Sequence, residues 1–572
     1  MVPAWLTLAA ALAVAPTPST IAALPPEASA GRGASLPFVE YEAENATTNG
    51  DRIGPDRRFT TIAAEASGRE AIRLQGPGRF VEFTLARPAN ALTARIAIPD
   101  SADGKGLDAS IGIYVEGQRI GALAATSRYG WYYGAYPFSN RPADGRPHHV
   151  FDEARLLLER TLPAGTRVQL RIGEGDGAPW YAVDLADFEL VPPPSPPPPG
   201  VLLLTRFGAD PSGRIDSSGA FRRGVAKAAA SGRTLWIPPG NFRVEGHVVV
   251  DRVTIAGAGS WHSVLTGRRI GLYGRRAPGG SRRVVLRDFA IFGDVRERRD
   301  HDQVNGIGGA MGGGSRIENL WIQHVKVGLW FDGPMDRIIV RGLRILDTAA
   351  DGLNFHRGVS HAIAENNFVR NSGDDGLAAW SGKAADHHIA FRRNTVIAPI
   401  LANGIALYGG HDLEVSGNVV ADTVTEGGGL HIGNRFAAVP VSGAIDLVDN
   451  LVVRSGSFDP RWRFGVGAFW LYALDAPIDA RISVRGLRIL DSSEEAVSLM
   501  GKAINGLHLN DVTILGARSH ALTLRSAGSA DIAGMTVAGL GAEAVLDCSQ
   551  GFVLDDLGGN RGIDSRTRAG CR

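Results

Sequence analysis

The chain has 572 residues, of which 44 % are hydrophobic and 21 % charged, and 74 are glycines. This length exceeds one ordinary domain, and the composition is that of a globular, β-leaning protein rather than a disordered or fibrous one. A formal net charge of +1 offers no electrostatic reason to expect nucleic acid or an anionic membrane as a partner. It fits a neutral polymer such as a glucan better than polygalacturonate.

The first thirty residues predict a signal peptide and therefore a secreted protein. An apolar run from Ala4 to Ala15 precedes a proline-containing stretch and a small-residue cleavage site at Ala28-Ser29-Ala30. The run has no Lys or Arg before it, and the alternative is a disordered leader. No later segment approaches the roughly twenty apolar residues of a membrane span.

Residues 36–191 predict an antiparallel β-sandwich, because short alternating runs are separated by clusters of Gly, Pro, Asn and Asp. The proline-rich string at 192–200 predicts an extended linker and a domain boundary. Between the strands lies an aromatic loop at 127–138. Its candidates for stacking on sugar rings are Trp131, Tyr132, Tyr133 and Tyr136, although the pleat must send some of them into the core.

The opening run of the sandwich, VEYEAENA (39–46), and its closing run, DLADFEL (184–190), resemble carbohydrate-binding modules of families 35 and 6. The resemblance implies a structural calcium held by first-strand acids and a last-strand Asp. Carried over here, the candidate ligands are Glu42, Glu44 and Asp187, which offer the hard oxygens that calcium prefers. The alternative is that they are solvent-facing strand carboxylates.

Residues 201–572 predict a parallel β-helix. A short amphipathic helix is expected over 219–230, capped by Asp216, Ser217 or Ser218. It resembles the helix that covers the open end of secreted right-handed β-helix enzymes, where an uncovered coil would leave backbone groups unpaired.

The remainder of the chain repeats with a period near 24 residues. Asn319, Gly342, Asn367, Asn394 and Asn418 each precede a β-branched or aromatic run. A second strand follows each such run, and the series contains VGLWF (327–331), DGLNF (351–355), DGLAA (375–379), NGIAL (403–407), GGLHI (428–432), VGAFW (466–470), EAVSL (495–499) and HALTL (520–524). Leucine-rich repeats have a similar length, but their L-x-x-L-x-L pattern is absent.

Three aspartates fall together in this repeat. Asp351 and Asp375 occupy equivalent positions on successive coils and should stack about 4.8 Å apart, the spacing of paired strands. We expect this pair to activate a water as general base, and the adjacent Asp374 to act as general acid. A wider carboxyl separation of about 6.5–9.5 Å would indicate inversion. The alternative is structural, since Asp-Gly is a common turn dipeptide.

Aromatic and polar residues follow the same strand series and are candidates for sugar subsites: His356, Trp380, Tyr408, His431, Asn434, Arg435 and Trp470. Two histidine pairs, 148–149 and 387–388, lack further ligands at metal-binding spacing and are expected at the surface. The only cysteines, Cys548 and Cys571, can staple the last coil in an exported protein; the alternative is two separate thiols.

Several runs resemble glycoside hydrolase family 87, among them ILDTAADGLNFHRGVS (345–360), VRNSGDDGLAAWS (369–381) and GGGLHIGNR (427–435). The resemblance covers nearly all of 201–560. It implies an inverting hydrolase whose three aspartates fall on Asp351, Asp374 and Asp375. It also implies α-1,3-glucan or nigeran as the substrate. We further expect a monomer that needs no cofactor for catalysis.

Other classes of protein share this architecture. A dextranase or polygalacturonase would use the same chemistry with different subsites. A pectate lyase would need a calcium-binding acidic cluster and a basic residue, for which Arg357 is near. A non-catalytic glycan-binding solenoid would have no reason to stack carboxylates that repel each other.

Overall fold

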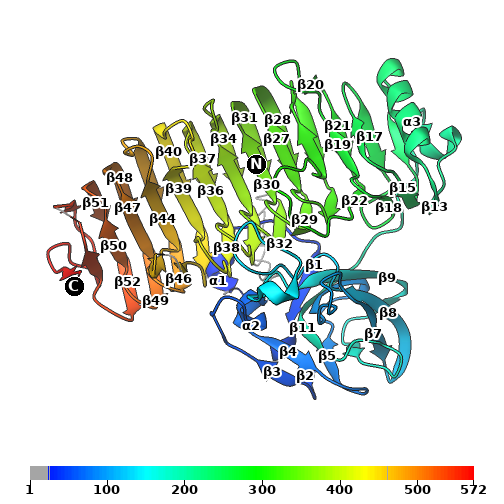
Figure 1. The fold of residues 1–572 in the computed structure, drawn as a ribbon, viewed down its shortest axis with the longest axis horizontal. Coiled ribbons are helices and arrows are strands. Elements are labelled where there is room, and N and C mark those ends of the chain that lie inside the picture. The colour runs from blue at the N-terminus through cyan, green and yellow to red at the C-terminus, as the bar shows by residue number, and fades with distance from the viewer. Residues whose placement is uncertain (1–23, 25, 460–461, 550, 572) are drawn as a thin grey trace, which may run out of the picture.

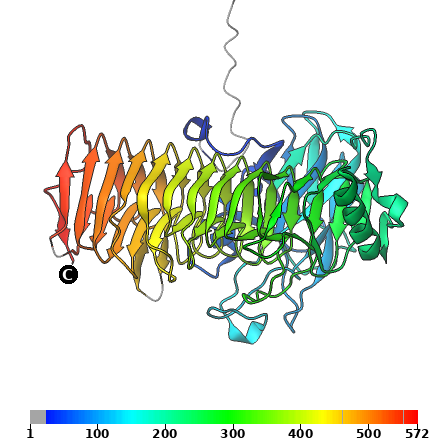
Figure 2. The same cartoon turned by 90° about the horizontal axis from the view of Figure 1, so that it is seen from above.

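The computed structural model describes residues 24, 26–459, 462–549 and 551–571. A β-sandwich lies against one side of a long parallel β-helix, and the chain runs along the solenoid to the C-terminus (Figures 1 and 2). Over these residues no helix is both long and apolar enough to cross a membrane. The predicted all-β fold of a sandwich followed by a parallel β-helix is confirmed.

The α-helices of the described residues are few and short. They are α1 (Pro26–Ser29), α2 (Ile62–Glu65) and α3 (Ser218–Ser231). The predicted helix over 219–230 is α3, which packs buried Phe221 and Val225 onto the first coil and closes that end of the solenoid (Figure 1). The predicted signal peptide lies mostly outside the described residues, but α1 is described and buries Ala28 against the solenoid.

The sandwich consists of two antiparallel sheets that enclose one apolar core. One sheet contains β1 (Phe38–Glu42), β3 (Asp51–Ile53), β4 (Ala71–Leu74), β6 (Ala89–Ala97), β9 (Asp152–Leu162) and β11 (Tyr181–Glu189). The other contains β2 (Thr47–Thr48), β5 (Phe80–Thr84), β7 (Asp108–Val115), β8 (Gln118–Thr126) and β10 (Arg167–Arg171).

The solenoid has three parallel sheets of 14, 13 and 13 strands, and each coil contributes one strand to each. The first sheet begins at β12 (Leu202–Leu203) and ends at β54 (Val553–Asp556). The second begins at β13 (Ser212–Asp216) and ends at β52 (Thr536–Leu540). The third begins at β16 (His247–Val249) and ends at β55 (Ala569–Gly570).

The turns that lead from the second sheet to the third carry the chemistry described below. The second-sheet strands before them are β29 (Arg344–Thr348), β32 (Phe368–Ser372), β35 (Thr395–Ile397), β38 (Val419–Ala421), β41 (Leu451–Val453), β46 (Arg488–Ser492) and β49 (Thr513–Ala517). The third-sheet strands after them are β30 (Leu353–His356), β33 (Leu377–Trp380), β36 (Ile405–Tyr408), β39 (Leu430–Asn434), β44 (Phe469–Ala473), β47 (Val497–Gly501) and β50 (Leu522–Arg525). A hairpin of β42 (Ser457–Asp459) and β43 (Phe464–Val466) enlarges the turn between β41 and β44.

The register follows the repeat read from the sequence. The eight predicted strands pair in one unbroken series from Leu329 to Leu522 in the third sheet, through their third residues except in VGAFW, where the fourth residue, Phe469, takes the paired position. The predicted asparagines form a buried ladder, in which the Nδ2 of Asn367, Asn394 and Asn418 each donates to the Oδ1 of the next rung, ending on Asn450. The ladder satisfies amide groups that would otherwise be buried without partners.

Buried ion pairs fasten the sandwich to the second solenoid sheet. Arg370, fully buried on β32, donates to Glu40 at 2.8 Å, to Glu153 at 2.7 Å and to Asp187 at 2.7 Å. Arg95 of the sandwich forms an ion pair with Asp184 and donates a hydrogen bond to the Oδ1 of Asn371, on the solenoid, at 2.9 Å. Because these charges have left water, the two parts form one folded unit rather than a module on a tether.

Candidate active site

Asp351 lies in the turn between β29 and β30, and Asp374 with Asp375 lies in the equivalent turn of the next coil. The backbone N–H of Gly352 donates to the carbonyl of Asp375 at 3.0 Å, so the two turns stack. One carboxylate oxygen from each of the three aspartates lies within 4.8 Å of the others. The structure thus brings together the three acids that the repeat places in register.

Asp375 is held by hydrogen bonds in a buried position. Tyr408 donates its hydroxyl to Oδ2 at 2.8 Å, and Asn403 donates its backbone N–H and its Nδ2 to Oδ1 at 2.8 and 2.9 Å. Burial, followed by the charge of Asp374, raises the pKa of Asp375 to about 7, against the opposing effect of these donors. This carboxyl therefore titrates near neutral pH.

Asp351 is also buried, and burial together with the charges of Asp374 and Asp375 raises its pKa well above the ordinary value. Asn354 donates its Nδ2 to the Oδ2 of Asp351 at 2.7 Å. The Oδ1 of Asn354 is buried and makes no hydrogen bond within the described residues. It is a polar atom that a substrate hydroxyl can use.

Asp374 differs from its neighbours in exposure and in charge partner. Its side chain keeps 20 % of its surface exposed, and it is ion-paired with Arg298, which also donates to the carbonyl of Gly373 at 3.1 Å. Arg298 bonds Asp300 at 2.9 Å, and Asp300 in turn accepts from the hydroxyl of Tyr136. The sandwich loop therefore reaches the acid cluster through Tyr136.

The predicted aromatic loop of the sandwich divides between core and surface. Tyr132 and Tyr133 are buried, and Trp131 is half-buried and donates its indole N–H to the carbonyl of Ile98. Tyr136 is 56 % exposed. Of the four candidates for contact with sugar, the structure presents Tyr136 beside the acids.

The predicted subsite residues lie along the third sheet. His356 and Trp380 occupy paired positions, are half-buried and have ring centroids 4.7 Å apart. His431 is buried, stacks on Trp470 at 3.9 Å, and has an Nε2 without a hydrogen-bond partner among the described residues. Trp470 is fully buried and donates to the Oδ1 of Asn403 at 2.7 Å, so it helps to position the side chain that binds Asp375.

Two further candidates have different surroundings. Asn434 is buried, and its side-chain amide hydrogen-bonds to the backbone. It donates to the carbonyl of Pro477 at 2.7 Å and accepts from the N–H of Val441 at 2.8 Å. The guanidinium of Arg435 is half-buried and lies 4.1 Å from the ring centroid of Phe436. Asn434 therefore shapes the strand end, whereas Arg435 remains at the surface of the sheet.

The residues expected to bind calcium have different hydrogen-bond partners. Asp187 accepts from Arg370 in the domain interface, whereas Glu42 accepts from the hydroxyl of Ser67 at 2.8 Å. Glu42, Glu44 and Asp187 are not among the described acid groups whose oxygens lie within 4.8 Å of one another. Calcium binding by this set stays a prediction.

Reasoning from the sequence missed several residues of the site. Asn403 could have been found from the repeat, because Asn403-Gly404 is the equivalent of Asp375-Gly376 one coil later. No sequence pattern indicated Arg298 and Asp300, since they lie in an irregular loop that the repeat does not cover.

The disulfide between Cys548 and Cys571, with Cα atoms 5.0 Å apart, links the last coil to the C-terminal segment.

A parallel β-helix that gathers three acids beside a row of aromatic and polar side chains is typical of enzymes that cleave polysaccharides. Residues 35–191 match the family model described as alpha-1,3-glucanase catalytic domain D1, and residues 219–438 match catalytic domain D2. The chain belongs to the GH87 alpha-1,3-glucanases. The sandwich corresponds to the part named D1 of the catalytic domain, in agreement with its buried attachment to the solenoid.

Solved structures agree with this assignment. The catalytic unit of a thermostable GH87 alpha-1,3-glucanase from Streptomyces thermodiastaticus strain HF3-3 is 38 % identical, with a TM-score of 0.85 over 93 % of this chain and 98 % of that one. The Agl-KA catalytic domain is 26 % identical, with a TM-score of 0.85 over 92 % and 99 %. A GH87 alpha-1,3-glucanase in complex with nigerose is 23 % identical, with a TM-score of 0.82 over 92 % and 100 %. No curated protein matches the chain.

Proposed function

We propose that this enzyme hydrolyses α-1,3-glucosidic linkages in α-1,3-glucan or nigeran, with Asp351, Asp374 and Asp375 as its catalytic residues. The observation that carries the proposal is the convergence of these three carboxylates on the scaffold of this family. In one relative, single aspartates replaced by alanine in complexes with nigerose or tetrasaccharides lie at two adjacent positions and 23 residues before the first of them. The spacing here is the same, since 374 − 351 = 23.

The roles follow from exposure and charge. Asp374 is the most exposed of the three and is therefore the acid that a bound glycosidic oxygen can reach. Asp351 and Asp375 stack beneath it and can hold one water between them, with Asp375, whose pKa is about 7, as the general base. Arg298 is ion-paired with Asp374 in the free protein, so a bound sugar must displace this contact to reach the carboxyl.

A substrate with a fluoride leaving group tests the role of Asp374. Fluoride departs without protonation, so Asp374→Asn should lose activity on glucan but retain it on α-nigerosyl fluoride. Asp375→Asn should lose activity on both, because the water is no longer activated. Loss of both activities in Asp374→Asn would assign the acid role to another residue.

We propose that hydrolysis inverts the anomeric carbon, because the stacked pair can hold a water on the side opposite the acid. The closest approach within 4.8 Å is shorter than the separation of about 6.5–9.5 Å typical of inverting pairs, so the proposal rests on the stacking and not on that spacing. Proton NMR of the first product is the measurement: β-anomer indicates inversion, and α-anomer would refute it.

The substrate is tested by reducing-sugar release from α-1,3-glucan, nigeran, dextran and polygalacturonate in parallel. Release from α-1,3-glucan or nigeran alone is the expected result, and the preferred polymer identifies the linkage pattern. Release from dextran or polygalacturonate would keep the fold and correct the substrate. No release from any of them by a folded protein would favour a glycan-binding solenoid.

We also propose that the protein is secreted, on the basis of the apolar leader and the Ala28-Ser29-Ala30 site. An insoluble glucan cannot enter a cell, so an enzyme that degrades it must be exported. N-terminal sequencing of protein recovered from culture medium is the test. An intact Met1 on the exported protein would refute cleavage.

A further inference from the structure

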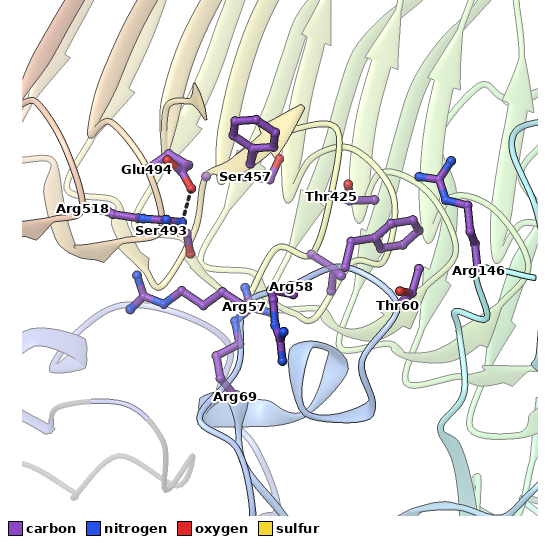
Figure 3. A pocket seen from close by; sticks show the side chains of 14 residues that line it. Arg57, Arg58, Thr60, Arg69, Arg146, Thr425, Ser457, Ser493, Glu494 and Arg518 are labelled. Carbon is purple, nitrogen blue, oxygen red and sulfur yellow. Dashed lines mark hydrogen bonds and ion pairs between the residues drawn. The ribbon is translucent and has the colours of Figure 1, made fainter. Parts of the chain in front are cut away.

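A cavity lies between the sandwich and the solenoid, away from the three aspartates. It has a volume of about 450 Å³. A sandwich loop carrying Arg57, Arg58 and Thr60 faces the solenoid turns that carry Thr425, Ser457 and Glu494 (Figure 3). Phe59, Arg69, Arg146, Phe458 and Arg518 also line it. Neither part of the protein forms this cavity alone.

The cavity lies on the same edge of the solenoid as the acids. Asp375 directly precedes β33, whereas Thr425 precedes β39, two coils later, and Arg518 precedes β50, five coils later. At the strand spacing of about 4.8 Å, these turns lie roughly 10 to 24 Å from Asp375 along the solenoid. The half-buried turn residue Ala402 lies on the coil between Asp375 and Thr425.

One buried polar atom of a residue that lines the cavity has no hydrogen-bond partner among the described residues. It is the Oγ1 of Thr425, a residue 3 % exposed. The neighbouring Arg69, also 3 % exposed, already has its Nε in an ion pair with Asp422 at 3.8 Å. Buried polar atoms are normally satisfied, and the exception at Thr425 points to a partner outside the chain. Its Oγ1 suits a sugar hydroxyl, which donates and accepts.

The cavity combines aromatic rings with charges that are largely offset. Arg57 pairs with Asp491 at 2.5 Å, Arg518 with Glu494 at 2.9 Å, and Arg58 with Asp56 at 2.7 Å. Phe458 is 50 % exposed, and the guanidinium of Arg146 lies 5.8 Å from the ring centroid of Phe59. Apolar rings beside paired charges suit a neutral polyhydroxylated ligand better than an anion.

We propose that this cavity is a distal subsite for the same α-glucan chain, built jointly by the sandwich and the solenoid. It rests on the proposed function, because the occupant is the polymer that crosses the three aspartates. A chain long enough to span both regions gains contacts that a short oligosaccharide does not reach. The enzyme therefore acts more efficiently on long chains, as an endo-acting hydrolase does.

The test compares chain lengths in variants of the cavity. For α-1,3-glucooligosaccharides, kcat/KM should rise with length beyond the tetrasaccharide in the wild-type enzyme. Phe59→Ala, on the sandwich, and Phe458→Ala, on the solenoid, should each lower kcat/KM for long chains about tenfold and leave it nearly unchanged for the disaccharide. Thr425→Val, which keeps the side-chain shape, serves where an alanine variant unfolds.

A matched control and a binding measurement complete the test. Arg146→Ala should behave like the phenylalanine variants, whereas Arg160→Ala, in a cavity on the sandwich alone, should change nothing. Calorimetry in an Asp375→Asn background measures Kd for long and short chains without turnover. Equal Kd for both lengths, or equal losses at every length, would overturn the distal subsite. A lack of hydrolysis of every polymer would instead refute the proposed function.

Discussion

Replacing Arg370 with Met tests whether the buried ion pairs hold the sandwich and solenoid together. The guanidinium is fully buried and serves Glu40, Glu153 and Asp187 at 2.7–2.8 Å. Removing one partner of a buried ion pair costs about 3–5 kcal/mol, because it leaves a charge without compensation. Three carboxylates share this partner, so we expect a loss of about 5 kcal/mol at pH 8.

The loss should depend on pH in a definite direction. Burial already raises the pKa of Asp187 to about 6, against the opposing charge of Arg370, and the substitution will raise it further. A carboxyl whose pKa in the folded state exceeds its unfolded value of about 4 costs stability as the pH rises through the folded value. At pH 5 the carboxyls can take up protons instead, and the loss in Arg370→Met should be smaller than at pH 8.

Urea unfolding followed by tryptophan fluorescence at both pH values is the measurement. Arg344→Met is the matched control, because Arg344 has a single carboxylate partner across the same interface among the described residues, Glu189 at 2.5 Å, and should lose less. Adding Glu153→Gln to Arg370→Met should restore part of the stability at pH 8. A loss below about 1 kcal/mol at pH 8, or an equal loss at pH 5, would refute the reasoning.

Three further predictions concern the site and the coils. Asp375→Asn should lower kcat by at least about a hundredfold without changing the urea midpoint, since the amide keeps the shape; a shifted midpoint would indicate a structural role. Tyr408→Phe removes a hydrogen bond that lowers the pKa of Asp375, so the acid limb of the pH–rate profile should move to higher pH; an unmoved limb would contradict Asp375 as the base. Asn418→Ala removes the acceptor of the backbone N–H of Asn394 and one of the two acceptors of its Nδ2, and should cost about 1–3 kcal/mol of unfolding free energy by urea titration, whereas a surface ladder would cost nothing.

How much the sequence predicts depends on whether an interaction follows the repeat. The stacking of Asp351 on Asp375 and the ladder through Asn394 and Asn418 were predictable, because a coil of nearly constant length brings equivalent positions together. The contact of Arg298 with Asp374 was not, since an irregular loop carries it. The pairing of Asp187 with Arg370 was not either, because their separation of 183 residues leaves no local pattern.

The sequence of the proline-rich stretch between sandwich and solenoid predicts an extended linker and a domain boundary. The two parts that it joins are nevertheless held together by buried ion pairs. Even within the linker, the backbone N–H of Ser195 donates to the carbonyl of Ala258 at 3.0 Å. A protease that cuts at 192–200 should therefore nick the chain and leave one associated particle on gel filtration. Expressing the solenoid alone would expose Arg370 and the second-sheet face to water. In this protein the covalent boundary and the cooperative folding unit do not coincide.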